Sequence, residues 1–308
     1  MKYNSDIFVI WDLHWNLAAY YENLRFLNLI DTEWSWIWWD SKIIFLWDIL
    51  ADRHQNWMQI MLEIEKLKKQ AKKNAWNIEV IFWNHDYKFV LFSSTDIPFK
   101  IHKSSYVGLF ELRQFSSLLH KDDLDYDSLK LDQKKIYKNM ISSEDWKKLI
   151  KAICNMKLVY RENDILFLHT NPTYEILQSL YANKIEDINK IFLNWLKKIF
   201  SWKFNKADND VSNFFELAIL YLLLNRRDSI PEYEKWWIYD ALNELWINYI
   251  INWHNWYWWT VDTRGNIKII DIDYSFGKYE WIADSQRSVA SIKKDWSIYL
   301  WVNRLKLV

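Results

Sequence analysis

Short apolar runs alternate with amphipathic segments in the first third of the chain. Strand-like runs cover residues 6–12, 41–48 and 78–86, and helical apolar spacing covers 17–30 and 58–73. This alternation predicts a βαβαβ unit with a parallel sheet. Ligands of such sheets bind at the carboxyl ends of the strands. All three runs end in polar residues, so this edge is where we expect a functional site.

The rest of the chain predicts further strands separated by helical segments. Four more runs have strand-like patterns, at residues 164–173, 247–254, 260–273 and 297–308. We expect the last three of them to form a second, antiparallel sheet. Charged helical stretches at about 90–160 and 174–245 are expected to be insertions in a single domain of residues 1–308.

Composition excludes several classes of function. Lysine and arginine balance aspartate and glutamate at net charge 0, which gives no electrostatic basis for binding nucleic acid or an anionic membrane. A single cysteine, Cys154, excludes an internal disulfide and favours a reducing compartment. The first residues lack a long apolar segment, so no signal peptide is expected. The predicted location is the cytoplasm.

The chain has 23 tryptophans and only 3 glycines. Ordinary usage would give about 22 glycines in a chain of this length. Many of the tryptophans lie in turn-like contexts where glycine is usual, such as 38–40, 252–256 and 294–297. Because the codon UGA encodes glycine in some bacterial lineages, we hypothesise that many printed tryptophans are glycines in the native protein. The alternative is a protein that is truly rich in tryptophan.

Polar residues that suit a metal site follow five strand-like runs in order. They are Asp12 and His14; Asp48, with Asp52 and Arg53; Asn84, His85 and Asp86; His169; and His254. Tryptophans flank most of them, at positions 11, 15, 47, 83 and 253. With glycine at those positions, the motifs become D-x-H, G-D, G-N-H-D, H and G-H.

This order of motifs resembles the calcineurin-like metallophosphoesterase superfamily, from Asp12 to His254. The resemblance implies an α/β fold, a four-layer α/β/β/α metallophosphoesterase sandwich with helical insertions. It also implies two divalent metal ions that activate a water for attack on phosphorus. Manganese is the expected metal, with iron, zinc or magnesium as alternatives.

The resemblance also implies a role for each residue. The metal ligands would be Asp12, His14, Asp48, Asn84, His169 and His254. His85 would be the general acid, Asp86 would orient it, and Arg53 would bind phosphate oxygens. A second phosphate-binding arginine is expected at Arg226 or Arg227.

Within the superfamily, the chain is most similar to the phosphoprotein phosphatase branch. Position 256 lacks a second histidine of G-H-x-H, and residues 32–53 look like the bacterial Shewanella-like type. On that basis Trp36 is a true tryptophan, whereas glycine is expected at positions 34, 38 and 39. Three departures are His54 where glycine is usual, Asp86 where glutamate is usual, and 169–171 where His-Gly-Gly is usual.

The sequence therefore predicts a phosphatase that hydrolyses phosphate monoesters and resembles serine/threonine protein phosphatases. Its substrate would be a phosphorylated protein or a small phosphoester. One alternative is a dinucleoside polyphosphate hydrolase of the same superfamily, and another is a non-catalytic binding module on a decayed phosphatase fold. We also expect the tryptophans beside the predicted ligands to be strained or exposed, since a turn there favours glycine.

Overall fold

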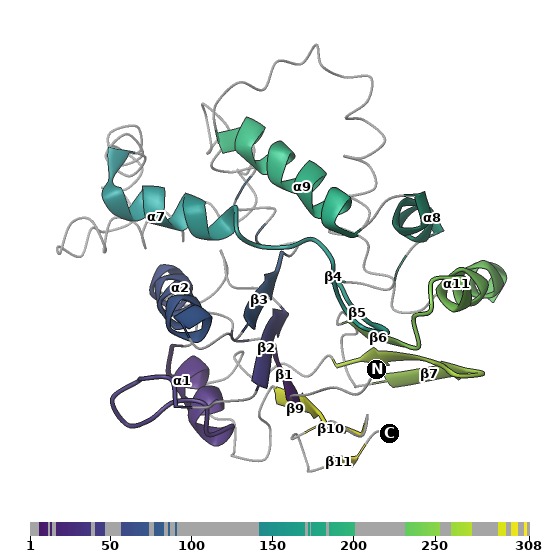
Figure 1. Cartoon of the computed structure of the whole chain (residues 1–308), viewed down its shortest axis with the longest axis horizontal. Coiled ribbons are helices and arrows are strands. Elements are labelled where there is room, and N and C mark those ends of the chain that lie inside the picture. The colour runs from purple at the N-terminus through teal and green to yellow at the C-terminus, as the bar shows by residue number, and fades with distance from the viewer. Residues whose placement is uncertain are drawn as a thin grey trace, which may run out of the picture.

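Two β-sheets lie face to face between layers of helices in the computed structural model (Figure 1). The residues that the structure describes are 6–11, 13, 17–37, 41–46, 57–73, 77–82, 86, 90, 142–169, 172, 174–182, 185–200, 232–252, 260–272, 289–293, 297–300 and 305–306. The predicted four-layer α/β/β/α architecture is confirmed. Among these residues, no helix combines the length and the apolar character needed to cross a membrane.

The first sheet has six strands in the order β11-β10-β9-β1-β2-β3. The strands are β1 (Asp6–Trp11), β2 (Ser41–Leu46), β3 (Asn77–Ile81), β9 (Val289–Ile292), β10 (Ile298–Leu300) and β11 (Leu305–Lys306). Strands β1, β2 and β3 are parallel neighbours, as the βαβαβ pattern predicts. The chain then returns through β9, which pairs antiparallel with β1.

Helices α1 (Leu17–Phe26) and α2 (Trp57–Lys73) cover one face of the first sheet. This face is apolar because alternate residues of β1, β2 and β3 there are Phe8, Ile10, Ile43, Phe45, Ile78 and Val80, all buried. The ring of Phe45 stacks on Tyr20 of α1 with 6.1 Å between centroids. The two helices are therefore fastened to the sheet by apolar packing.

The second sheet has five strands in the order β4-β5-β6-β8-β7. They are β4 (Tyr160–Glu162), β5 (Ile165–Phe167), β6 (Tyr249–Asn252), β7 (Thr260–Arg264) and β8 (Ile267–Asp271). Strands β5, β6 and β8 are parallel, and β4 and β7 are antiparallel edge strands. The hairpin between β7 and β8 turns at Gly265, whose φ of +58° suits glycine.

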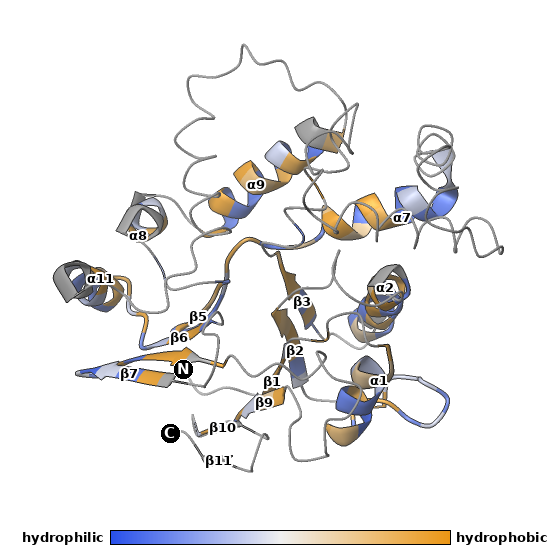
Figure 2. Ribbon diagram, turned by 180° about the vertical axis from the view of Figure 1, so that it is seen from behind, coloured by the Kyte–Doolittle hydropathy of each residue, from blue (hydrophilic) through white to orange (hydrophobic). Residues whose placement is uncertain are grey.

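Four more helices are present among the described residues, and each buries apolar side chains. They are α7 (Glu144–Ile153), α8 (Tyr174–Ala182), α9 (Ile185–Phe200) and α11 (Glu232–Glu244). Helices α8 and α11 pack together, and α11 contacts β8 (Figure 1). Hydrophobic and hydrophilic residues alternate along α7 and α9 (Figure 2), as expected of helices with one face buried.

Two details of the predicted topology are wrong. The run at 297–308 does not join the second sheet, since β10 and β11 extend the first sheet through β9. The second sheet is mixed rather than antiparallel, because β5, β6 and β8 run the same way. Alternating apolar residues identify a strand but carry no information about which sheet edge receives it. Strands β4 and β9 were not predicted from the pattern, because two of the three residues of β4 are charged and the middle of β9 is Ala290-Ser291.

The expectation of strain or exposure is also wrong for Trp11. This residue is the last of β1, is fully buried, and is not among the residues with positive φ. Extended backbone is open to any residue, so the end of the strand tolerates the indole. Its Nε1–H is nevertheless buried without an acceptor, which costs about 1–3 kcal/mol. The other four tryptophans of that prediction, at 15, 47, 83 and 253, lie outside the described residues.

Candidate functional site

The carboxyl ends of β1, β2 and β3 lie level with one another. Trp11 is in register with Leu46, and Leu46 is in register with Ile81. These residues end their strands. In the chain, each is followed within three residues by a predicted ligand, namely Asp12, Asp48 and Asn84.

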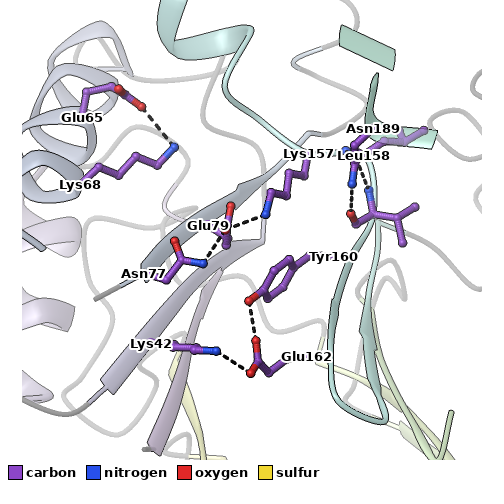
Figure 3. Close-up of polar contacts among 11 residues, drawn as sticks. Lys42, Glu65, Lys68, Asn77, Glu79, Lys157, Leu158, Tyr160, Glu162 and Asn189 are labelled. Carbon is purple, nitrogen blue, oxygen red and sulfur yellow. Dashed lines mark hydrogen bonds and ion pairs between the residues drawn. The ribbon is translucent and has the colours of Figure 1, made fainter. Parts of the chain in front are cut away.

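A polar cluster joins the two sheets and shows how they are oriented (Figure 3). We call it the inter-sheet cluster; its members are Lys42, Asn77, Glu79, Lys157, Tyr160 and Glu162. Lys42 Nζ lies 2.5 Å from Glu162 Oε1, and Lys157 Nζ lies 2.7 Å from Glu79 Oε1. Asn77 also donates to Glu79, at 2.6 Å. The cluster thus connects β2 and β3 to β4 and the segment before it.

The tyrosine of the inter-sheet cluster is held in its neutral form. Tyr160 Oη donates a hydrogen bond to Glu162 Oε2 at 2.6 Å. Burial raises the pKa of this phenol well above its usual range, and the hydrogen bond to the Glu162 carboxylate raises the pKa further. Tyr160 is therefore a fixed donor that orients Glu162 toward Lys42.

The inter-sheet cluster fixes the direction of β4. Lys157 pairs with Ile81 at the carboxyl end of β3, whereas Glu162 pairs with Lys42 near the start of β2. Strand β4 therefore runs from the carboxyl edge of the first sheet toward its amino edge. Since β5 is antiparallel to β4, it runs back toward the carboxyl edge.

The carboxyl ends of β5 and β6 consequently lie on the same side of the sandwich as those of β1, β2 and β3. Strand β6 is parallel to β5, with Phe167 in register with Ile251. Leu168, one residue beyond β5, donates its N–H to Ile251 O at 3.3 Å. His169 follows directly, and β6 ends at Asn252, two residues before His254 in the chain. Five parallel strands from two sheets thus end at one edge.

Two residues of the predicted site are described by the structure. Asp86 follows β3 and is 0% exposed, and His169 follows β5 and is 2% exposed. Polar side chains this deeply buried need partners within the protein or in a bound group. The other predicted site residues lie outside the described part of the chain, namely Asp12, His14, Asp48, Arg53, Asn84, His85, Arg226, Arg227 and His254.

The donor set fits a divalent metal by its chemistry. Carboxylate, amide oxygen and imidazole nitrogen together suit Mn²⁺, Zn²⁺ or Fe²⁺. Buried His169 has the position expected of such a ligand, at the end of a parallel strand. In the described part of the chain, no three His, Cys, Asp or Glu side chains are grouped closely enough to hold a metal ion. The metal centre therefore stays a prediction.

A cavity of about 860 Å³ lies elsewhere, between β4 and helices α8 and α9. Its lining includes Arg161, Asn189 and Lys190 but neither Asp86 nor His169. Arg161 alternates with Tyr160 and Glu162 along β4, so it points away from the inter-sheet cluster. Size alone does not make this cavity the candidate site, because the residues suited to phosphate chemistry follow other strands.

Sequence reasoning missed the inter-sheet cluster. The signal was the polar residues within mainly apolar strands, namely Lys42 in β2 and Asn77 and Glu79 in β3. Such residues are also compatible with a strand that has one face in water. Whether these residues face water or pair with another segment depends on their partners at 157–162, which are distant from β2 and β3 in the sequence.

Comparison with known proteins supports the fold. Neither protein-family models nor curated protein sequences match the chain. Among solved structures, the chain is similar to a cold-active protein tyrosine phosphatase, with a TM-score of 0.67, 15% identity, and coverage of 98% of this chain and 78% of that one. It is also similar to the cold-active protein-tyrosine phosphatase of a psychrophilic Shewanella species, with a TM-score of 0.66, 14% identity, and coverage of 99% and 80%. The chain thus has a phosphatase-type α/β fold over nearly its whole length.

Proposed function

We propose that the protein is a metal-dependent phosphatase that hydrolyses phosphate monoesters on proteins. The main support is that five parallel strands end at one edge, each followed closely by residues of a metallophosphoesterase motif. The fold similarity over 98% of the chain adds to this, because the similar structure is itself a phosphatase. That structure is of a protein tyrosine phosphatase, so phosphotyrosine joins phosphoserine and phosphothreonine as a proposed substrate.

Two divalent metal ions, when bound, would supply positive charge to the phosphate oxygens and a water of lowered pKa. The residues proposed to hold them are Asp12, His14, Asp48, Asn84, His169 and His254. The proposed task of Arg53 is to grip phosphate oxygens, for which its planar guanidinium is suited.

His85 is proposed to donate a proton to the leaving oxygen as the phosphate ester bond breaks. Without that proton the leaving group would depart as a high-energy alkoxide or phenolate. Asp86, the next residue, is buried, and a buried carboxylate is suited to hold an imidazole ring in one orientation. Asp86 is thus proposed as a positioning residue rather than as one that touches the substrate.

The experiment measures hydrolysis of p-nitrophenyl phosphate with and without Mn²⁺. Two versions of the protein are compared, the chain as printed and a variant with Trp11→Gly, Trp15→Gly, Trp47→Gly, Trp83→Gly and Trp253→Gly. We expect activity in the glycine variant that chelation by EDTA removes and Mn²⁺ restores. A folded glycine variant that binds Mn²⁺ but does not turn over any phosphate ester would contradict the proposal.

Matched variants separate chemistry from folding. In the active background, His85→Ala should lower kcat by about 10²–10⁴-fold, the usual contribution of a general acid. Lys147→Ala serves as the control, because the Lys147 side chain is 62% exposed on α7, a helix that carries no predicted ligand. Its activity should equal that of the parent.

Substrate choice is tested with a phosphotyrosine peptide, a phosphoserine peptide and a dinucleoside tetraphosphate. Preference for either peptide supports the proposed protein phosphatase. Preference for the dinucleotide would replace it with the polyphosphate hydrolase. Metal binding without any turnover would favour the non-catalytic binding module.

A further inference from the structure

Four non-glycine residues in the described part of the chain have a left-handed backbone. Their φ values are +55° for Asn28, +63° for Trp34, +54° for Asn163 and +56° for Trp246. Asparagine enters this region readily, because its short polar side chain fits beside the backbone. A bulky residue there is an outlier. Two of the four positions are thus occupied by a residue type that the backbone disfavours.

The ends of α1 and α11 show this contrast in one motif. At α1, Asn28 N donates to Arg25 O at 2.8 Å and Leu29 N donates to Leu24 O at 2.9 Å. These are the two hydrogen bonds of a Schellman motif, with Asn28 as its left-handed residue. Leu24 and Leu29 are both buried, and these are the two positions at which the motif usually carries apolar residues.

Helix α11 ends with the same pair of hydrogen bonds. Trp246 N donates to Asn243 O at 3.0 Å, and Ile247 N donates to Leu242 O at 2.9 Å. Leu242 and Ile247 are buried, as their counterparts at α1 are. The left-handed residue of this motif is usually glycine and sometimes asparagine. Here it is Trp246.

No packing of the Trp246 side chain explains its presence. The residue is 80% exposed, so the indole adds a large apolar surface to water. What Trp246 contributes to the fold comes from its backbone, which also accepts a hydrogen bond from Arg161 Nη2 at 3.1 Å. Glycine would keep every one of these backbone contacts.

Trp34 occupies the left-handed position of a hairpin loop. Asp31 N donates to Ser35 O at 2.9 Å and Trp34 N to Asp31 O at 3.3 Å, which closes the three-residue loop 32–34. In such loops a type I turn is followed by one left-handed residue, normally glycine. The Trp34 ring does contact Tyr21, with 3.8 Å between centroids, and Arg25, at 3.9 Å. Position 246 therefore gives the stronger evidence for glycine, because side-chain contacts could account for a tryptophan at position 34.

Two tryptophans inside helices, in α7 and α9, have the opposite character. Trp146 of α7 is 7% exposed and packs in the core, and Trp195 of α9 stacks on Phe192 with 5.9 Å between centroids. Glycine at either position would remove these contacts and lower the helix propensity.

We infer that positions 34 and 246 carry glycine in the native polypeptide, whereas 146 and 195 carry tryptophan. Composition suggests that some tryptophans are glycines, and the family resemblance points to position 34 among them. The backbone gives independent support at position 34 and newly assigns position 246. The assignment does not rest on the proposed function, because neither position 34 nor 246 adjoins a predicted ligand. It predicts two codons in the native gene, UGA at 34 and 246 and UGG at 146 and 195.

Tandem mass spectrometry of the protein purified from its native organism tests the assignment position by position. Cleavage after lysine and arginine yields four peptides that carry the positions, at residues 26–42, 236–264, 139–147 and 191–197. We expect glycine at 34 in the first and at 246 in the second, and tryptophan in the last two. Tryptophan at 34 or 246 overturns the inference, and so does glycine at 146 or 195.

Thermal unfolding of recombinant variants gives an independent test of the physical reason. Trp246→Gly should raise the melting temperature by about 2–4 °C through relief of the left-handed strain. Asn28→Gly, at the equivalent position of α1, should change it little, and Trp146→Gly should lower it. A lower melting temperature for Trp246→Gly than for the parent would contradict the backbone argument.

Discussion

The two faces of the first sheet are held in different ways. The face toward α1 and α2 is apolar over the central residues of β1, β2 and β3, with Phe45 packed on Tyr20. The face toward the second sheet is apolar near the carboxyl edge but carries Lys42, Asn77 and Glu79 toward the amino edge. The apolar face stabilises the packing of helices on the sheet but does not fix their relative orientation, because hydrophobic contact has little directionality. The polar contacts set the orientation of one sheet relative to the other.

The largest expected effect comes from removing a ring on the helix face. Phe45→Ala should lower the free energy of unfolding by about 3–5 kcal/mol, since it removes a fully buried ring and leaves a cavity. Urea unfolding followed by circular dichroism measures the loss. Phe45→Leu keeps most of the volume and should lose about 1.5 kcal/mol or less. If both variants lost the same free energy of unfolding, the contribution of Phe45 would not come from filling space in the core.

A smaller effect is expected from the inter-sheet cluster. Lys42→Ala leaves the Glu162 carboxylate, which is 16% exposed, without its ion pair and should lower the free energy of unfolding by about 1–3 kcal/mol. The matched control is Lys147→Ala. Lys147 and Glu144 are also 2.5 Å apart but 62% and 75% exposed, so the control should show no measurable change. Equal changes in the free energy of unfolding for Lys42→Ala and Lys147→Ala would show that the inter-sheet ion pair contributes no more than an exposed one.

The smallest effect is a pH dependence at Tyr160. Burial and the hydrogen bond to Glu162 raise the pKa of this phenol in the folded protein. The stability that the neutral phenol contributes is therefore fully present below about pH 10, its unfolded pKa, and is lost as pH rises further. Tyr160→Phe should lose about 0.5–1.5 kcal/mol near pH 7. The difference in free energy of unfolding between Tyr160→Phe and the parent should shrink above about pH 10. A difference that stays constant at higher pH would contradict the raised pKa of Tyr160.

Strong periodicity made the βαβαβ unit predictable. Strands β1, β2 and β3 and helices α1 and α2 lie within a few residues of the predicted ranges, because each buries an apolar face that the residue spacing displays. The runs at 164–173, 247–254 and 260–273 likewise contain β5, β6 and the β7–β8 hairpin. Strands β4 and β9 were missed, since Tyr160-Arg161-Glu162 is mostly charged and Val289–Ile292 has Ala-Ser at its middle, so neither forms an apolar run.

For the candidate site, the sequence supplies the residue types and their order along the chain, and their joint role as a metal centre stays a prediction. Asp86 and His169 are the predicted residues within the described part, and both are buried after strands of the two sheets. The family resemblance implies that the ends of β5 and β6 share an edge with those of β1, β2 and β3, because it assigns His169 and His254 to the same metal pair, but the apolar spacing of the residues does not show this. In the structure the shared edge follows from ion pairs between residues about 80 to 120 positions apart in the chain.

By itself, the sequence determined where most helices and strands lie, because the spacing of apolar residues and the residues suited to turns are properties of short stretches of chain. It also determined the residue types available for chemistry at the strand ends. The tertiary structure alone decided which sheet receives the last strands, how β4 aligns the second sheet, and which tryptophans have a left-handed backbone. These features depend on contacts between distant segments, which sequence periodicity does not encode.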